Sequence, residues 1–378
     1  LQTDEPHEAI QFFTKNEDEI KEVMSAGDTK ASVKLQENNF QVDVRVIPEK
    51  SWGAALVYFT GSKAHNIVLR TIALKKGLRL NEYGLFKASD ETAMVAGKSE
   101  EEIYSTLGMD YIEPELRENR GEIEAATNHA LPKLITLSDI RGDLQMHTEY
   151  SDGKGTIRSM AEKAISLRYE YIAITDHVGS LRVANAMNEA RIKEQRKEID
   201  KLNDTYEKSG AEFKIIQGAE VNIKSDGKLD MPDAVLKEIE IVLASIHSGF
   251  SDDSQKITNR IASAMENENV DIIAHPTGRK IFERSGYSFD LRKIIEKALG
   301  TGTLLEIDGH ANRLDLNDEN SREVLKAGVM MSIDTDSHES GELDYMLLGV
   351  AQARRAWSRK EDILNTKSYS ELVKFLKS

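Results

Sequence analysis

Short apolar runs alternate with longer amphipathic stretches from about residue 141 to the end of the chain. The apolar runs lie at 143–147, 171–174, 213–216, 241–244, 270–274, 303–307 and 329–333, and helical periodicity marks 157–167, 187–207, 253–267 and 292–299. Continuous apolar strands that alternate with helices are typical of a parallel sheet whose two faces are both covered. The runs therefore predict an α/β fold with a closed or nearly closed barrel.

The chain before residue 141 has a different pattern. An amphipathic segment that begins at 9–13 predicts a helix. Residues 31–35 and 40–46 alternate with period two around a polar turn at 37–39, which predicts a pair of strands. A further strand is expected to end at Gly61, and Ser62 is expected to cap the helix that follows.

Three boundaries follow from these patterns. Residues 61–115 are predicted to be helical with short loops, whereas 116–140 are polar and weakly periodic and contain Pro132, which favours a linker. We therefore divide the chain into segments 1–60, 61–115, 116–140 and 141–378.

Length and composition narrow the class of protein. The 378 residues suggest two or three domains, and 39% hydrophobic with 30% charged residues fits a folded globular chain. The formal net charge of −15 excludes a general nucleic-acid-coating protein, so any DNA contact requires a local basic patch. Cysteine is absent, which excludes disulfides, thiolate metal sites and a cysteine nucleophile.

The apolar runs have the length of strands, so the sequence predicts no membrane span and no membrane partner. No basic segment followed by an apolar core opens the chain, and we expect a cytoplasmic protein. The sequence does not predict an oligomeric state.

The histidines stand where a barrel carries its chemistry. Five of the nine lie at or just beyond the carboxyl end of a predicted strand: His147, His177, His247, His275 and His338. Carboxylates occupy matching positions: Asp152, Asp176, Glu220, Glu306 and Asp336. The carboxyl ends of parallel barrel strands converge on one mouth, and imidazole with carboxylate binds zinc, manganese or iron. We therefore predict a cluster of two or three divalent metal ions, with Asp176 or Glu306 alternatively orienting a ligand or capping a helix.

The order of these motifs resembles the PHP (polymerase and histidinol phosphatase) domain. The segments HTEYSDG at 147–153, ITDH at 174–177, GAE at 218–220, SIH at 245–247, AHP at 274–276 and DSH at 336–338 follow one another as in that family. The resemblance covers residues 141–378 and implies a distorted (β/α)7 barrel with a multi-metal site. It implies as metal ligands His147, Asp152, His177, Glu220, His247, His275, Asp336 and His338.

One position departs from the PHP pattern. The family usually opens with His-x-His, and Gln145 stands at the first of these histidines. A glutamine amide oxygen is neutral and binds transition metals more weakly than imidazole does. We therefore expect one metal position to be weakened or empty while the others keep their ligands.

The preceding segment resembles the palm end and thumb of a prokaryotic family X DNA polymerase, in which a PHP domain follows in the same order. The resemblance rests on FQVDVRVIP at 40–48, YFTGSKAHN at 58–66, LNEYGLF at 80–86 and YIEPELR at 111–117. It implies that Asp43 is the third carboxylate of a two-metal nucleotidyl-transfer site. It also implies a nucleotide- and DNA-binding set of Tyr58, Phe59, Gly61, Asn66 and Arg70, within a stretch from Lys50 to Leu80 that has six basic and no acidic residues.

The other two carboxylates of that family would lie on an earlier strand, immediately before Leu1, so we expect an N-terminally truncated polymerase. Asp43 alone would not hold the Mg²⁺ pair, and the chain as given is not expected to polymerise DNA. An intact homologue would bind deoxynucleotides and magnesium.

Three functions are compatible with the sequence. The first is a DNA-repair polymerase fragment that binds primer–template or gapped DNA, whose PHP barrel is a metal-dependent 3′–5′ exonuclease with His247 and Asp336 as catalytic residues. The second is a phosphomonoesterase of the histidinol-phosphatase type. The third is a non-catalytic DNA-binding scaffold whose metal cluster is disarmed by Gln145.

Overall fold

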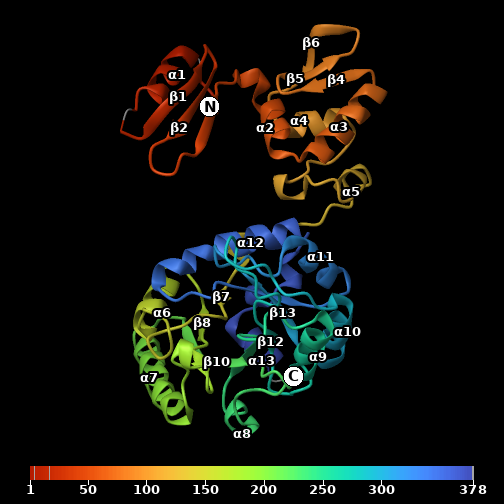
Figure 1. Ribbon diagram of the computed structural model, residues 1–378. Helices are drawn as coiled ribbons and strands as arrows, with labels where there is room; N and C mark the ends of the chain where they lie inside the picture. The colour runs from red at the N-terminus through yellow and green to blue at the C-terminus, as the bar shows by residue number, and fades with distance from the viewer. Residues whose placement is uncertain (4, 17, 377–378) are drawn as a thin grey trace. The chain divides into compact units, whose positions relative to one another are not determined.

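The computed structural model describes residues 1–3, 5–16 and 18–376. The chain forms two compact units, Leu1–Leu131 (unit 1) and Pro132–Ser378 (unit 2), which are drawn in Figure 1. Each unit has its own sheets and its own layer of helices, so each is described by itself.

Unit 2 is a barrel of short parallel strands. They are β7 (Gly142–Asp143), β8 (Tyr171–Ile174), β9 (His177–Val178), β10 (Lys214–Asn222), β11 (Ile241–Ser245), β12 (Ile272–Ile273), β13 (Leu304–Asp308) and β14 (Met331–Asp334). Parallel pairs join them in the order β14-β13-β12-β11-β10-β8-β7, and β9 pairs with β10. A parallel bridge between Met146 and Ser337 links the segments after β7 and β14, so the sheet is nearly closed. The predicted α/β barrel is confirmed.

Helices surround these strands (Figure 1). They are α6 (Ile157–Ser166), α7 (Glu189–Lys208), α8 (Asp233–Leu236), α9 (Ser254–Ala264), α10 (Leu291–Thr301), α11 (Asp318–Lys326), α12 (Met346–Arg355) and α13 (Tyr369–Leu376). Five of them begin after a side chain that accepts a hydrogen bond from the first turn: Thr156, Asn188, Asp253, Asp290 and Asn317. Among the described residues, no helix has the length and apolar content needed to cross a bilayer.

The strands of unit 2 are buried on both faces and are therefore rich in apolar residues, but they also carry buried polar side chains such as Glu220, Glu306 and Asp334 in their carboxyl-terminal halves. Along β8, Tyr171 packs inside the barrel, whereas its neighbour Ile172 packs against the helices. The inner cluster draws on the first residues of strands, such as Ile241 and Leu304, and on Leu372 of α13. The apolar filling therefore occupies the amino-terminal half of the barrel, and the carboxyl ends are left to polar side chains.

Unit 1 begins with a helix and an antiparallel sheet. The elements are α1 (Pro6–Thr14), β1 (Ile20–Ala26), β2 (Lys30–Leu35) and β3 (Gln41–Arg45), in the sheet order β1-β2-β3. The predicted helix and the two predicted strands are present. Strand β1 was not predicted because nearly all of its side chains are exposed, so its sequence carries no alternating apolar signal.

The second part of unit 1 corrects two predictions. It contains α2 (Trp52–Thr60), α3 (Lys63–Lys75), β4 (Leu78–Asn81), β5 (Gly84–Lys87), β6 (Asp90–Ala96), α4 (Glu100–Thr106) and α5 (Glu122–Thr127). The segment before Gly61 is helical rather than a strand, because Ala54, Ala55 and Val57 form the buried face of α2. Residues 61–115 are also not wholly helical, since β4, β5 and β6 form an antiparallel sheet. Ser62 caps α3 as expected, accepting a hydrogen bond from the His65 N–H.

The segment predicted as a linker contains structure that belongs to unit 1. Arg117 is fully buried; its Nε donates to the Ile112 carbonyl at 2.9 Å, and its guanidinium lies 2.6 Å from the Glu100 carboxylate. Glu122 in α5 is also buried and lies 2.6 Å from His65 Nδ1. The chain therefore remains packed beyond Leu116. The remaining short 3-10 turns lie at Glu49–Ser51, Pro114–Leu116, Leu137–Asp139, Arg182–Ala184, Ser340–Tyr345, Lys360–Asp362 and Leu364–Thr366.

Candidate metal centre

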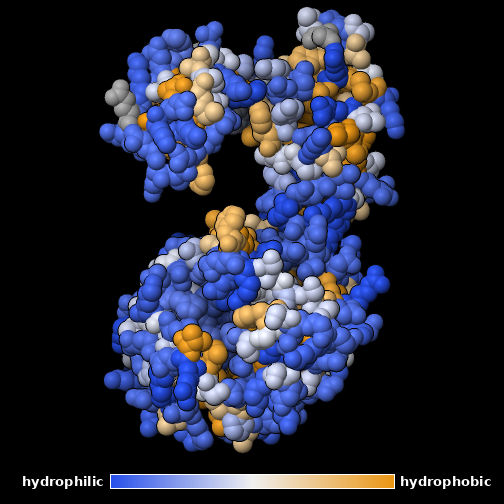
Figure 2. All heavy atoms as spheres, in the orientation of Figure 1, coloured by the Kyte–Doolittle hydropathy of each residue, from blue (hydrophilic) through white to orange (hydrophobic). Residues whose placement is uncertain are grey.

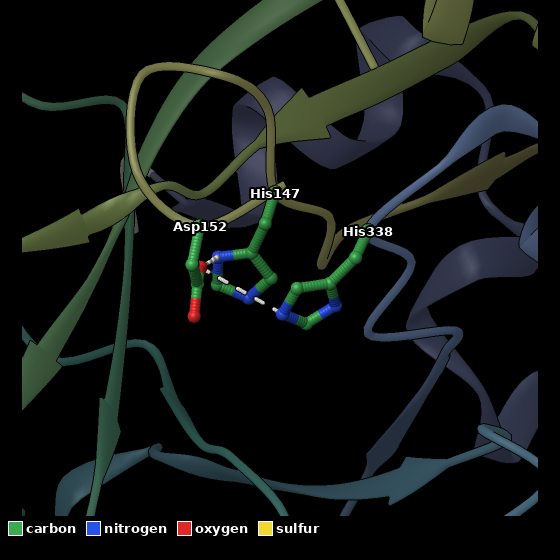
Figure 3. A group of neighbouring side chains, drawn as sticks. All are labelled: His147, Asp152 and His338. Carbon is green, nitrogen blue, oxygen red and sulfur yellow. Dashed lines mark ion pairs between the residues drawn. The ribbon is translucent and has the colours of Figure 1, made fainter. Parts of the chain in front are cut away.

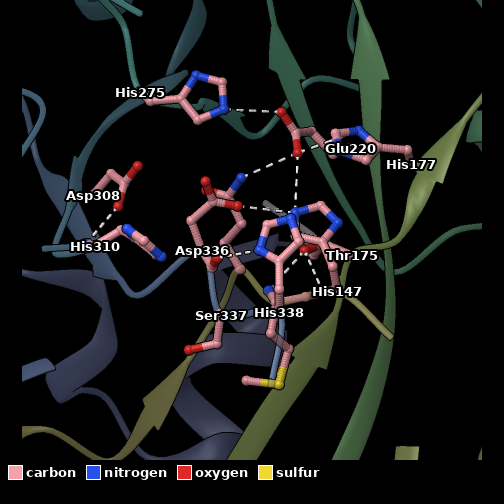
Figure 4. A network of polar contacts seen from close by, with 12 residues as sticks. His147, Thr175, His177, Glu220, His275, Asp308, His310, Asp336, Ser337 and His338 are labelled. Atoms are coloured by element: carbon pink, nitrogen blue, oxygen red, sulfur yellow. Dashed lines mark hydrogen bonds and ion pairs between the residues drawn. The ribbon is translucent and has the colours of Figure 1, made fainter. Parts of the chain in front are cut away.

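All eight residues predicted as metal ligands gather at the carboxyl ends of the unit 2 strands. They come from the segment after β7 (His147, Asp152), from β9 (His177), from β10 (Glu220), and from the segments after β11 (His247), β12 (His275) and β14 (Asp336, His338). Figure 4 shows six of them, His147, His177, Glu220, His275, Asp336 and His338, gathered at this mouth. Parallel topology brings them together, because every contributing strand ends at the same mouth.

Glu220 lies at the centre of the cluster. Its Oε1 is 3.1 Å from His275 Nε2 and 3.3 Å from His247 Nε2. Its Oε2 is 3.2 Å from His147 Nε2, and that nitrogen is 3.0 Å from Asp336 Oδ1. The two oxygens of one carboxylate therefore face two different sets of imidazoles.

Asp152 is the centre of a further set, part of which is drawn in Figure 3. Its Oδ1 lies 3.7 Å from His177 Nε2, 3.7 Å from His338 Nε2 and 4.0 Å from His147 Nδ1. Three triads have ligand atoms within 4.8 Å of one another: His147, Asp152 and His338; His147, His177 and Glu220; and Glu220, His247 and His275. Ligands about 2.0–2.2 Å from a shared ion stand roughly 3–4 Å apart, so these separations suit divalent cations.

Unpaired buried atoms give an independent test of that fit. Both ring nitrogens of His147 and of His275, His177 Nδ1 and Glu220 Oε1 are buried, and although several of them lie near an opposite charge, none of them forms a hydrogen bond. Buried polar atoms are rarely left unpaired, and each one costs free energy. Their convergence on the same mouth is the arrangement that bound cations would complete.

The electrostatics of the cluster follow from burial and close opposite charges. Burial raises the pKa of Glu220, but the imidazoles of His247 and His147 outweigh it and hold the pKa well below its ordinary range. Burial lowers the pKa of His147, yet Asp336 and Glu220 raise it well above its usual value. Burial also lowers the pKa of His177 to about 3, which keeps its ring neutral, the form in which imidazole binds metal.

Gln145 does not present its amide oxygen to the cluster's carboxylate. Its Nε2 donates to Glu220 Oε2 at 3.2 Å, and its buried Oε1 has no hydrogen-bond partner. A donor amide group occupies the place at which the PHP pattern has an imidazole lone pair. Whether this amide weakens one metal position stays a prediction, which metal binding by a Gln145 variant would test.

Arg313 is a member of the site that the sequence did not predict. Its Nε lies 3.1 Å from Asp336 Oδ2 and 3.2 Å from Asp308 Oδ2. Burial raises the pKa of Asp336, but Arg313 and His147 reverse this and hold the pKa well below its usual value. Arg313 lies in the loop between β13 and α11, where the sequence has no periodic pattern. Its place in the site becomes visible only in the fold, which brings its side chain to Asp336.

Asp176 and Glu306, for which the sequence left two roles open, accept hydrogen bonds from the segments that carry metal ligands. Asp176 accepts hydrogen bonds from the Thr148 N–H at 2.7 Å and the Ser151 hydroxyl at 2.5 Å, which hold the loop that carries Asp152. Glu306 Oε2 accepts a hydrogen bond from the His275 N–H at 2.5 Å. Both carboxylates fit the orienting alternative.

The residues predicted for nucleotide and DNA binding lie in unit 1. Asp43 in β3 is exposed and accepts hydrogen bonds from Ser32 Oγ and from Gln41 Nε2, the latter at 3.1 Å. It lines a cavity of about 410 Å³ together with Lys30, Arg45, Trp52 and Phe59. Of the predicted set, the structure brings only Asp43 and Phe59 together in this cavity.

The other members of that set are held by local contacts. Tyr58 and Phe59 in α2 meet edge to face with ring centroids 5.0 Å apart. Asn66 Nδ2 donates to the Tyr58 carbonyl at 2.9 Å and the Gly61 carbonyl at 3.1 Å, and Arg70 Nε donates to the Asn66 carbonyl at 3.2 Å. The two Asn66 bonds join the end of α2 to the start of α3, and the Arg70 bond lies within α3.

Comparison with known proteins agrees with this arrangement. Residues 55–118 match the DNA polymerase beta thumb, and residues 143–372 match the PHP domain. The chain is 43% identical over 359 residues to the "DNA polymerase/3'-5' exonuclease PolX" of Bacillus subtilis (strain 168), covering 95% of this chain and 62% of that protein. It therefore spans less than two thirds of that relative's length.

Two further proteins show similarity to part of the chain. A probable phosphatase of Thermoanaerobacter sp. is 31% identical over 162 residues, covering 40% of this chain and 64% of that protein. The crystal structure of histidinol phosphate phosphatase from Lactococcus lactis, complexed with zinc, L-histidinol and phosphate, is 16% identical, with a TM-score of 0.42 and coverage of 55% of this chain and 92% of that chain. The profile match over most of unit 2, with the barrel and its ring of histidines and carboxylates, shows that the chain belongs to the PHP domain family.

Proposed function

We propose that unit 2 is a metal-dependent phosphoesterase that hydrolyses DNA phosphodiesters from the 3′ end. The observation that carries this proposal is the pair of ligand sets on the two oxygens of Glu220, with the Asp152 set beside them. Three adjacent sets suit two or three closely spaced cations of zinc, manganese or iron. Such ions, when bound, hold a phosphate and lower the pKa of a water to near neutrality.

The residues of the chain have separable roles in this proposal. His147, Asp152, His177, Glu220, His247, His275, Asp336 and His338 hold the metals. His247 is partly exposed at the rim and has its ring within 3.2 Å of Ser245 Oγ, so it can also move a proton to or from the substrate. Asp336 acts as a catalytic residue, and its ion pair with Arg313 holds the carboxylate in place.

DNA is the proposed substrate because of unit 1. The thumb match at 55–118 and the basic stretch from Lys50 to Leu80 support contact with primer–template or gapped DNA. Under this proposal the thumb covers the matched residues 55–118, the segment before it is a palm end, and the barrel of unit 2 is the phosphoesterase. Asp43 would be the palm carboxylate, acting with Mg²⁺ and deoxynucleotides in an intact homologue.

The test is manganese-stimulated release of nucleotides from a 5′-labelled oligodeoxynucleotide. Glu220→Ala and His247→Ala should each abolish it and lower the bound metal, because each removes a shared or rim ligand. His129→Ala removes an exposed histidine of unit 1 and should change neither. Circular dichroism of each variant separates loss of the site from loss of the fold, and nuclease that survives both site changes would exclude this assignment.

Hydrolysis of a phosphomonoester is the second candidate, favoured by the similarity to a probable phosphatase. A comparison of kcat/KM between an oligodeoxynucleotide and histidinol phosphate decides between them. Near-zero bound zinc, manganese and iron after gentle purification, without activity on either substrate, would instead favour the scaffold.

A further inference from the structure

Two apolar side chains near the mouth of the barrel are exposed without a packing reason. Phe282 is 107% exposed and Val183 is 89% exposed, the highest values for large apolar side chains in the described part of unit 2. Val183 lies on the loop after β9, which carries His177, and Phe282 lies on the loop after β12, which leads from His275. Strands β10 and β11 separate β9 from β12, so the two loops rise from different parts of the rim.

The backbone at Phe282 also disfavours an aromatic residue. Its φ is 66°, in the left-handed region that glycine adopts freely and bulky residues rarely occupy. It stands in a tight turn in which the backbone N–H of Lys280 donates to the Arg284 carbonyl and the reverse bond forms, both at 2.9 Å. Neither packing nor backbone geometry therefore explains a phenyl ring at this position.

The turn is braced against the candidate metal centre. The Ile281 N–H donates to the Asn312 carbonyl at 2.6 Å, and Arg279 Nε donates to the Arg313 carbonyl at 2.6 Å. Arg313 is the residue whose side chain reaches Asp336 in the cluster. Phe282 is thus displayed on a fixed support one short segment away from the site.

The surroundings of Phe282 suit a nucleic-acid strand. Arg279, Lys280 and Arg284 place three positive charges against one negative charge, Glu283, within six residues of a chain whose net charge is −15. The Arg284 guanidinium carbon lies 3.8 Å from the centroid of the Phe250 ring, which belongs to the segment after β11, so a second aromatic ring lies beside this loop. Proteins that bind single strands combine positive charge for phosphates with aromatic rings on which bases stack.

We propose that Phe282 stacks on a nucleobase of the DNA strand whose scissile phosphate lies at the metal centre. The inference rests on the proposed function and adds a base-binding position outside the metal ligands. Stacking favours a polymeric substrate over a small phosphate ester, because only the polymer reaches from the metals to the rim. Val183 is the second apolar contact on the other loop.

The experiment compares the 378-residue chain with its Phe282→Ala, Phe282→Trp and Phe282→Gly variants on two substrates. With a short single-stranded oligodeoxynucleotide, we expect the alanine and glycine variants to raise KM about tenfold and the tryptophan variant to keep it. With bis(p-nitrophenyl) phosphate, kcat/KM should not change. Phe282→Gly should also leave the melting temperature equal or higher, because glycine relieves the left-handed backbone.

Leu299→Ala is the matched control. Leu299 is 56% exposed on α10, near the amino end of β13, and its removal should affect neither substrate. An unchanged oligodeoxynucleotide KM in Phe282→Ala, an equal loss on both substrates, or a change of sedimentation coefficient that signals a protein contact would each overturn the inference. If the wild type hydrolyses neither substrate, the proposed function fails; fluorescence anisotropy of the labelled oligodeoxynucleotide then tests Phe282 by itself, and equal binding by wild type and Phe282→Ala would overturn it.

Discussion

The predicted site residues of the two units differ in how they are arranged: those of unit 2 contact one another, whereas those of unit 1 mostly contact local backbone. In unit 2, side chains from distant segments meet around Glu220 at separations of 3.0–3.7 Å, mostly buried. In unit 1, the side chains of Asn66 and Arg70 donate hydrogen bonds to nearby backbone carbonyls. The exposed Asp43 carboxylate accepts hydrogen bonds from residues of its own sheet. A parallel barrel forces strand ends together, whereas an antiparallel sheet and a helical segment do not.

Burial makes the difference consequential. A ligand removed from the unit 2 cluster leaves buried partners uncompensated, whereas a change at Asp43 leaves groups that water can reach. We therefore expect substitutions at the unit 2 cluster to have large effects. In unit 1, we expect a large effect only where the substitution leaves a buried charge without its partner.

The largest expected effect separates the two candidate sites. His338→Ala should lower manganese-stimulated nuclease about 1,000-fold, because it removes one ligand of the Asp152 set. Asp43→Ala should leave the same rate within about twofold, since it lies outside that set. Both rates are measured on one labelled oligodeoxynucleotide. A comparable loss in Asp43→Ala would contradict the assignment of nuclease activity to unit 2 alone.

The next effect concerns the stability of unit 1. Arg117→Met should destabilise that unit by about 3 kcal/mol, because it leaves the Glu100 carboxylate without its buried partner. Arg45→Met is the control: its pair with Glu82 is partly exposed and 3.8 Å long, so we expect a loss below about 1 kcal/mol. If the two units unfold separately, urea unfolding of the whole chain should show two transitions, and Arg117→Met should shift only the transition of unit 1. An equal effect on the unfolding of unit 2 would mean that the units do not unfold independently.

A smaller effect depends on pH and belongs to unit 2. Burial raises the pKa of Asp271 to about 7, although its carboxylate accepts a hydrogen bond from the Val242 N–H at 2.8 Å. The folded state therefore keeps a proton that the unfolded state releases from about pH 4 upward, so this group lowers stability as pH rises from about 4 to 7. Asp271→Asn should gain about 2 kcal/mol over wild type at pH 8 and nothing at pH 4. Denaturant midpoints at the two pH values measure this, and an equal gain at both would disprove the titration.

The smallest effect tests the departure at Gln145. Gln145→His should raise the affinity of one metal position about tenfold, because imidazole replaces an amide that donates to Glu220. Metal-to-protein ratios after dialysis against limiting zinc measure it, with Gln145→Ala as the control that should gain nothing. An unchanged ratio in the histidine variant would show that residue 145 does not face a metal position.

The barrel could be predicted well because its signal is local. The longer strands of unit 2 are buried on both faces and contain short apolar runs, and the runs at 171–174 and 241–244 match β8 and β11 almost residue by residue. Unit 1 gave weaker signals: β1 is exposed, and Tyr58 and Phe59 have strand-forming side chains but lie in a helix. Tertiary packing of Ala54 and Val57 outweighed that local preference.

The sequence by itself determined which residue types end each barrel strand, because strand length and apolar continuity are properties of neighbouring residues. Only the tertiary structure decided how those side chains group: which imidazoles face each oxygen of Glu220, which way the Gln145 amide points, and that Arg313 returns to Asp336. These distances depend on how the sheet curves and closes, which couples residues nearly two hundred positions apart, and no short-range pattern encodes that curvature.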